Sequence, residues 1–175
     1  MKILKILPFV LLVTLLGLGI YFALGFEKQL ENQNYADFVK ASTNKTLEET
    51  NKQSKGINGV ENLSESEEST LKNLETISEE FKTTLKSEKE GFNSQKKPSG
   101  SEALDAKVVA FYDKAEEVNK EFDELVSDVK SLENSDLILE KLKNYNKGVS
   151  ELSDAYDEFA SEMTKFIDSN SGIKL

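Results

Sequence analysis

The sequence predicts an all-α protein, in which an N-terminal transmembrane helix precedes an elongated antiparallel three- or four-helix bundle with coiled-coil-like heptad packing. Three observations support this prediction. An uncharged apolar run occupies residues 6–26. In the last third of the chain, apolar residues recur at alternating spacings of three and four, which returns side chains to one helix face. The 175 residues include 9 Gly and 2 Pro, which leaves few turns and favours long helices over a β-rich fold.

The N-terminal region is predicted to be a membrane helix at residues 6–26, preceded by a short cytoplasmic tail at residues 1–5. At about 1.5 Å per residue, an apolar helix of this length crosses a hydrocarbon core of about 30 Å. Two lysines, Lys2 and Lys5, lie in the tail. Because positive charge favours the cytoplasmic side of a membrane, we expect residues 27–175 to be exported.

A cleaved signal peptide is the alternative interpretation of this region. Ala23 and Gly25 place small residues where a signal peptidase reads the chain, so cleavage after Gly25 would secrete the protein. The apolar run is longer than the usual signal-peptide core of about 7–15 residues, and Phe26 would be a bulky first residue. We therefore expect an uncleaved anchor and a single-pass protein of the cell membrane with an extracytoplasmic C-terminal domain.

Residues 27–175 are predicted to form one acidic helical bundle. Turn and capping signals divide the region into helices at about residues 27–55, 64–90, 102–132 and 136–168. Gly56 and Gly59 are expected to end the first helix, because glycine readily adopts the positive φ found at helix ends. The S-x-x-E patterns of Ser64–Glu67 and Ser99–Glu102 are possible capping boxes for the second and third helices. A loop at residues 91–100 separates these two helices.

The first two helices of the bundle have weak apolar faces. The apolar positions of the first are Leu30, Tyr35, Phe38, Val39 and Leu47. In the second, Ser78 and Glu88 occupy positions of the apolar heptad. We therefore expect the second helix to lie on the outside of the bundle.

The third and fourth helices have the strongest heptads. The core positions of the third are Leu104, Val108, Phe111, Ala115, Val118, Phe122, Leu125, Val129 and Leu132, and those of the fourth are Ile138, Leu142, Tyr145, Val149, Leu152, Tyr156, Phe159, Met163 and Phe166. The short segment 133–136 contains turn and N-cap residues, which predicts an antiparallel hairpin. One continuous helix is the alternative, but the step of six from Leu132 to Ile138 breaks the heptad phase.

Three residues of the fourth helix do not suit a plain apolar stripe. Tyr145 and Tyr156 each bring a hydroxyl to the core, so each must reach the bundle edge or find a hydrogen-bond partner. Gly148 costs about 1 kcal/mol relative to alanine in a helix. Close approach of another helix would explain this glycine.

Composition excludes several classes of function. The chain has no Cys and no His, which removes the commonest zinc and copper ligands, disulfides and the usual nucleophile–base pairs. All 32 acidic residues lie beyond Phe26, as do all but two of the 22 lysines. The region after Phe26 is therefore more acidic than the net charge of −10 implies, and we expect no nucleic-acid partner.

The short motifs in the chain are interpreted as surface features. Neighbouring carboxylates occur at Glu67 and Glu68, Glu79 and Glu80, Glu116 and Glu117, Asp123 and Glu124, and Asp157 and Glu158. They fall largely off the apolar stripes, whereas a catalytic pair must converge on a cleft. S-x-x-K matches begin at Ser42, Ser69, Ser94 and Ser127, without the partner motifs of a Ser–Lys nucleophile. We therefore expect no catalytic, cofactor-binding or metal-binding residue and no cofactor.

Two sequons for asparagine glycosylation begin at Asn44 and Asn62. They fall in the region that is predicted to be exported, and they would be used only in a host that glycosylates asparagine.

These observations lead to two hypotheses for function and one less favoured class. The first is a non-enzymatic interaction or structural role in the cell envelope, with a protein partner or self-association. The alternative is a sensory or solute-binding bundle with a small-molecule pocket between helices, lined by the aromatic residues Phe111, Phe122, Tyr145, Tyr156, Phe159 and Phe166. An enzyme ranks third, because no nucleophile–base pair or metal set is visible in the sequence.

Overall fold

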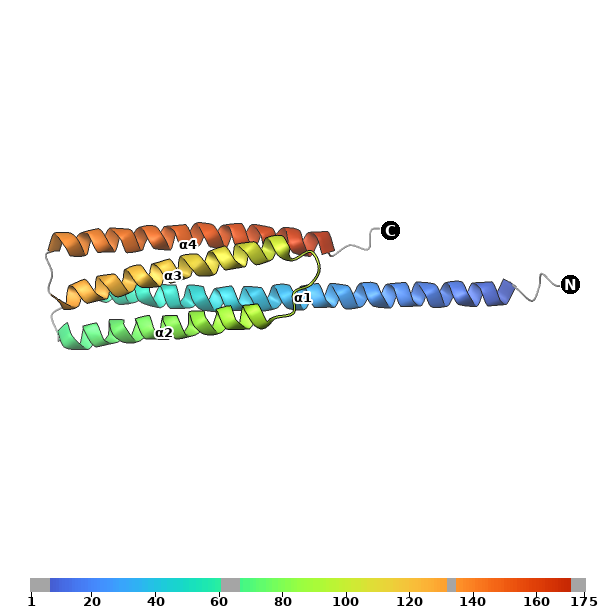
Figure 1. The fold of residues 1–175 in the computed structure, drawn as a ribbon, viewed down its shortest axis with the longest axis horizontal. Helices are drawn as coiled ribbons and strands as arrows, with labels where there is room; N and C mark the ends of the chain where they lie inside the picture. The colour runs from blue at the N-terminus through green and yellow to red at the C-terminus, as the bar shows by residue number, and fades with distance from the viewer. Residues whose placement is uncertain (1–6, 61–66, 132–134, 171–175) are drawn as a thin grey trace.

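The computed structural model describes residues 7–60, 67–131 and 135–170, and it describes side chains for residues 27–57, 68–131 and 137–170. Its four helices are α1 (Leu7–Val60), α2 (Glu67–Ser94), α3 (Glu102–Lys130) and α4 (Ser135–Asn170). No strand occurs in these ranges, so the all-α class is confirmed there. Figure 1 shows the helices side by side along one axis, with the N-terminal part of α1 extending far beyond the bundle.

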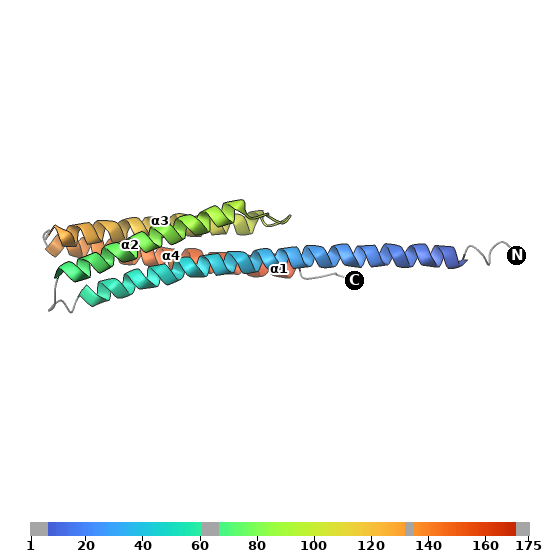
Figure 2. The same cartoon turned by 90° about the horizontal axis from the view of Figure 1, so that it is seen from below.

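The helices form an up-down-up-down bundle. Within the described residues, contacts join every pair of helices except α2 and α4. α2 and α4 therefore lie on opposite sides of the α1–α3 pair. Figure 2 gives a second view, in which α2 and α3 run along α1. The sequence predicts that α2 lies on the outside, but α2 and α4 each pack against α1 and α3, so α2 is no more external than α4. α2 contributes Leu74, Phe81, Leu85 and Phe92 to the core.

The predicted transmembrane span over residues 6–26 lies outside the residues whose side chains are described. Elsewhere in the described chain, no helix is both long enough and apolar enough to cross a membrane.

The core consists mainly of the two predicted heptads. In α3 every predicted position from Leu104 to Leu125 is buried, and Val129 is half-buried. In α4 Tyr145, Leu152, Phe159 and Phe166 are buried, and Val149, Tyr156 and Met163 pack against them. Leu132, the last predicted position of the third helix, lies outside the described residues.

The predicted hairpin of α3 and α4 is confirmed by the ion pairs that join the two helices. Lys114 Nζ lies 2.9 Å from a carboxylate oxygen of Glu151, and Lys107 Nζ lies 2.7 Å from one of Glu158. The lysine earlier in α3 pairs with the glutamate later in α4, so the two helices are antiparallel. A single continuous helix is thereby excluded.

The predicted end of the first helix at residue 55 is wrong, because α1 continues through Gly56 to Val60. A Cβ atom at Gly56 would lie 2.9 Å from Cδ2 of Leu74 on α2. Glycine therefore lets α1 and α2 approach closely, and Ile57 packs against the core in the next position. This packing outweighs the cost of about 1 kcal/mol for glycine inside a helix.

The predicted loop at residues 91–100 begins too early, because α2 continues through Gly91 to Ser94. Phe92 is 1% exposed and its ring centroid lies 6.0 Å from that of Tyr112. Burial of a phenylalanine side chain contributes about 1.5–3 kcal/mol, which exceeds the cost of Gly91. The turn follows instead at Gly100, whose φ of 89° falls in the left-handed region.

The start of α3 also differs from the prediction. Ser101 is the N-cap residue, but its hydroxyl donates to Oδ2 of Asp105 at 3.1 Å and accepts no hydrogen bond from a backbone N–H of the first turn. The capping box predicted over Ser99–Glu102 is therefore not formed. Most of the box predicted for α2 lies outside the described residues.

Candidate functional site

The face of α1 that enters the bundle is mostly polar, and this is the most unusual feature of the molecule. Its buried polar residues are Asn32, Ser42, Thr43, Thr46, Glu49, Thr50 and Gln53. Of the predicted apolar positions, Tyr35 and Val39 are buried, but Leu30 is 51% exposed and does not belong to the core. The buried face of α1 therefore combines a few apolar residues with a larger number of polar side chains that sequence patterning assigns to the surface.

Three cross-helix contacts join α1 to α3 and α4, whereas both side-chain polar atoms of Asn32 and Oε1 of Gln53 are buried without a partner among the described residues. Gln53 Nε2 donates to Oδ1 of Asn119 on α3 at 2.7 Å. The hydroxyls of Ser42 and Tyr112 share a hydrogen bond between α1 and α3. The hydroxyls of Ser54 and Tyr145 lie 3.1 Å apart between α1 and α4. Each contact pairs one residue of α1 with one partner, which fixes the axial position of the helix.

The threonines of α1 are satisfied within their own helix. Thr43 donates to the carbonyl of Val39 at 3.0 Å, and Thr50 donates to that of Thr46 at 3.2 Å. Such bonds leave the methyl groups to face the core. This part of the polar face is therefore structural rather than a binding site.

A tight polar cluster lies where α1 enters the bundle. The Tyr35 hydroxyl donates to the carboxylate of Asp105, which also accepts from Ser101 and lies 3.6 Å from Nζ of Lys97. Burial, followed by the contact with Asp105, raises the pKa of Tyr35 far above its ordinary value. Tyr35 therefore stays protonated as a donor, and the cluster binds α1 to the start of α3.

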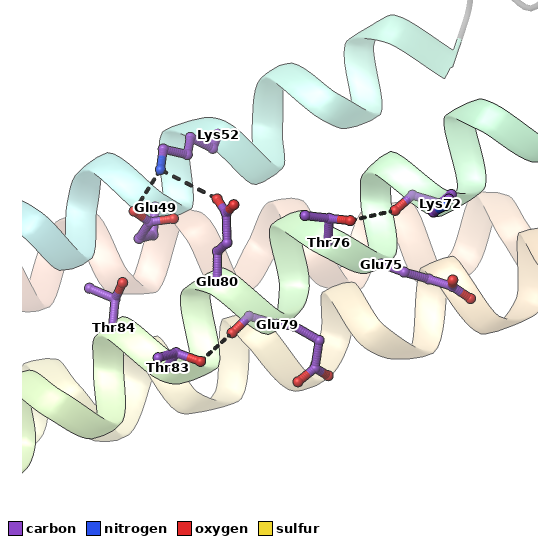
Figure 3. Close-up of a pocket in the computed structure, with 9 residues that line it drawn as sticks. All are labelled: Glu49, Lys52, Lys72, Glu75, Thr76, Glu79, Glu80, Thr83 and Thr84. Carbon is purple, nitrogen blue, oxygen red and sulfur yellow. Dashed lines mark hydrogen bonds and ion pairs between the residues drawn. The ribbon is translucent and has the colours of Figure 1, made fainter.

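An open groove between α1 and α2 is shown in Figure 3. It has a volume of about 710 Å³ and is lined by Glu49, Lys52, Lys72, Glu75, Thr76, Glu79, Glu80, Thr83 and Thr84. Lys52 Nζ bridges the carboxylates of Glu49, at 2.8 Å, and Glu80, at 3.7 Å (Figure 3). Oε2 of Glu49 has no hydrogen-bond partner among the described residues, but it is buried rather than turned to the groove. The groove is thus a charged surface with its own ion pairs.

Of the neighbouring carboxylates noted in the sequence, Glu79 and Glu80 both line this groove. Glu79, however, pairs with Lys82, and Glu80 pairs with Lys52.

The pair Glu116 and Glu117 is likewise divided between two lysines. Glu116 pairs with Lys89 at 2.8 Å, whereas Glu117 pairs with Lys114 at 2.6 Å. Each member of this pair therefore meets a different lysine. No cluster of three or more metal-ligating side chains occurs in the part of the chain that the structure describes.

The first S-x-x-K match and the first sequon are both built into the bundle. Ser42 bonds to Tyr112, whereas Lys45 pairs with Glu88 at 2.9 Å, so this serine and lysine are not brought together. The side chain of Asn44 accepts a hydrogen bond from Tyr156 at 3.1 Å, and Thr46 is fully buried. The folded bundle therefore hides this sequon, while Asn62 lies outside the described residues.

The predicted aromatic pocket is occupied by the rings themselves. The ring centroids of Phe111 and Tyr156 lie 6.0 Å apart, and those of Phe122 and Tyr145 lie 5.7 Å apart. The hydroxyls of Tyr145 and Tyr156 have hydrogen-bond partners on α1, as the sequence requires: Ser54 for Tyr145 and Asn44 for Tyr156. A Cβ at Gly148 would lie 3.3 Å from Cγ2 of Val118, so this glycine permits the close approach of α3.

A separate cavity of about 140 Å³ lies near the C-terminal end of α1. All four helices contribute to it, and its lining residues are Ile57, Leu74, Leu125, Val126, Val129, Ile138 and Leu142. Of these residues, Leu74, Leu125, Val129, Ile138 and Leu142 are predicted as apolar positions of their helices, whereas Ile57 and Val126 are not. The sequence contains no signal that the core would remain open there.

The polar face of α1 could have been found by following the heptad rather than the hydrophobicity. Positions 32, 35, 39, 42, 46, 49 and 53 continue one alternation of three and four. Most of them are polar, so a search for apolar side chains overlooks them.

Comparison with known proteins adds no assignment, because no protein-family model, curated protein or solved structure matches the chain.

Proposed function

We propose that the protein is a membrane-anchored, extracytoplasmic helical bundle with a non-enzymatic interaction or structural role in the cell envelope. The observation that carries this proposal is the continuity of α1, which runs as one helix from Leu7 to Val60. Residues 7–26 of the apolar run form the N-terminal part of this helix, and the run of residues 6–26 meets the length needed to span a bilayer. One helix would then be both the anchor and a member of the bundle.

The attachment of α1 to the bundle supports a structural role. The Tyr35–Asp105 cluster binds α1 at the end nearest the proposed anchor, and Gln53–Asn119 binds it near the other end. No flexible linker separates residues 6–26 from Tyr35 within α1. The bundle would therefore project from the membrane as a stalk with a fixed orientation.

Membrane fractionation of cells that express the full chain tests the anchor. We expect the chain in membranes after alkaline carbonate washing, and we expect added protease to reach the bundle from the extracytoplasmic side. The variant Leu12→Lys/Leu16→Lys should leave the membrane fraction, because a charge at the bilayer centre costs about 2.5–3.5 kcal/mol per residue on insertion scales.

The matched control is Ser150→Lys/Ser161→Lys, which adds the same charge at exposed positions of α4 and should remain in membranes. Wild-type chain in the soluble cell fraction, or a bundle protected from external protease, would contradict the proposal. Secretion of a chain that starts at Phe26 would identify a signal peptide instead.

Sedimentation equilibrium of the full chain in density-matched detergent distinguishes the two kinds of partner. A concentration-dependent oligomer supports self-association at the membrane. A monomer directs the interaction role to a different protein, which would contact the exposed acidic surface of the bundle.

A further inference from the structure

The aliphatic cavity near the C-terminal end of α1 lies where the core side chains change from aromatic to aliphatic. Phe122 and Tyr145, the neighbouring core positions on α3 and α4, are at most 1% exposed, and their ring centroids lie 5.7 Å apart. The next core positions outward, Leu125 on α3 and Leu142 on α4, are aliphatic and smaller. The helices are held at a separation that the aromatic layers set, so the smaller side chains leave about 140 Å³ between them.

We propose that this cavity binds a small, uncharged, apolar molecule of about the size of benzene. A cavity of about 150 Å³ lined by aliphatic and aromatic side chains is known to stay dry and to bind benzene or xenon. The present cavity is close to that volume, and every described residue in its lining has an aliphatic side chain. A charged or strongly polar ligand would lose its hydration there without gaining a hydrogen-bond partner.

The burial of the lining residues indicates where such a molecule enters. Leu74 and Leu125 are 3% and 5% exposed, whereas Val129, Ile138 and Leu142 are half-buried although they lie on the core stripe. Ile57 on α1 is half-buried as well, so among the described lining residues α1, α3 and α4 each keep some contact with solvent. A ligand reaches it without unfolding of the bundle.

This inference does not depend on the membrane anchor, and it gives a ligand class to the solute-binding alternative. The cavity lies at the end of the bundle opposite to the N-terminal extension of α1 (Figure 1). Loss of membrane attachment would leave the cavity intact, whereas a failure to bind ligand would leave the fractionation result unchanged.

The test is methyl NMR on the full chain, labelled at Ile, Leu and Val methyl groups and held in lipid nanodiscs, during titration with benzene. We expect saturable shifts at the cavity methyls and nuclear Overhauser contacts from benzene to Leu125 and Leu142. The variant Val129→Phe fills the cavity, and we expect it to weaken benzene binding at least tenfold.

The matched control is Val109→Phe, which makes the same change on α3 at a side chain that is 44% exposed, and benzene affinity should be unchanged. Contacts on the wild-type chain decide the question even if Val129→Phe does not fold. Absence of saturation up to the aqueous solubility of benzene, or contacts confined to lipid and to residues outside the cavity, would overturn the proposal.

Discussion

The core stripes of α1 and α4 follow the same heptad spacing but consist of opposite kinds of side chain. α4 buries Tyr145, Leu152, Phe159 and Phe166. At equivalent spacing, α1 buries polar residues that include Ser42, Thr46 and Gln53. Apolar burial contributes about 1.5–3 kcal/mol per large side chain, whereas a hydrogen bond contributes about 0.5–1.5 kcal/mol net. The α3–α4 hairpin therefore supplies most of the stability.

The polar stripe of α1 instead specifies position. Apolar side chains tolerate sliding because dispersion contacts are not directional, but Gln53 must meet Asn119 and Tyr35 must meet Asp105. A shift of α1 along its axis would leave both sets of groups buried without partners. In this bundle, one helix pair supplies most of the stability, and the polar contacts of another helix set its axial register.

The largest loss of stability is expected from a charge placed in the buried apolar contact between α3 and α4. Val118→Asp would bury an unpaired carboxylate at a side chain that is 0% exposed and lies against Gly148, so we expect a loss of more than about 4 kcal/mol and no folded bundle. Circular dichroism and urea denaturation of the full chain in micelles measure this. Val109→Asp, at an exposed site on the same helix, should change stability by less than about 0.5 kcal/mol. Normal assembly of Val118→Asp would show that the hairpin is not the source of stability.

A smaller loss of stability is expected at alkaline pH, because two tyrosines that hydrogen-bond to α1 have raised pKa values. Burial raises the pKa of Tyr112 and that of Tyr145 to about 12, from about 10 in the unfolded chain. Both are protonated in both states below pH 10, so their contribution to stability is constant there. Between pH 10 and 12 the unfolded chain loses these protons first, and stability falls.

Tyrosinate absorbance during a pH titration, with urea denaturation at each pH, measures this alkaline loss. Tyr112→Phe/Tyr145→Phe should flatten the decline but not abolish it, because the hydrogen bond with Glu75 also raises the pKa of Lys130, and a raised lysine pKa lowers stability as the pH rises. Titration of all tyrosines near pH 10 in the folded protein would contradict the assignment.

Substitutions at the Gln53–Asn119 hydrogen bond test whether this contact sets the register of α1 rather than adding to stability. Gln53→Leu or Asn119→Leu alone leaves the partner buried without its hydrogen bond and should cost about 1–3 kcal/mol. The double variant Gln53→Leu/Asn119→Leu replaces both polar groups and should be close to wild type in stability. A double-mutant cycle in urea measures the coupling, and additive losses would show that the contact does not act as a pair.

The smallest effect is expected at the surface of the hairpin. Lys107 and Glu158 form an ion pair at 2.7 Å between exposed side chains, and solvent screening makes such a pair weak. Lys107→Ala should therefore leave the urea midpoint unchanged within error at physiological salt. A clear drop in the midpoint would mean that the ion pairs of α3 and α4 contribute as well as their apolar contacts.

Several details of the candidate regions could not be predicted from the sequence. The continuation of α1 through Gly56 depends on Leu74, and the continuation of α2 through Gly91 accompanies the burial of Phe92 against Tyr112. In each case local propensity favours an end, and a residue on another helix reverses it. The aliphatic cavity likewise depends on the separation of four helices, which no single heptad encodes.

The sequence by itself determined the all-α class, the heptads of α3 and α4 and their antiparallel hairpin, because helical period and turn residues are local properties of the chain. Only the tertiary structure decided that α1 joins the core through polar side chains. Gln53 and Asn119 lie 66 residues apart, and each alone has the character of a surface residue. A polar residue is placed in a core by its partner, and the partner is known only once the helices are packed.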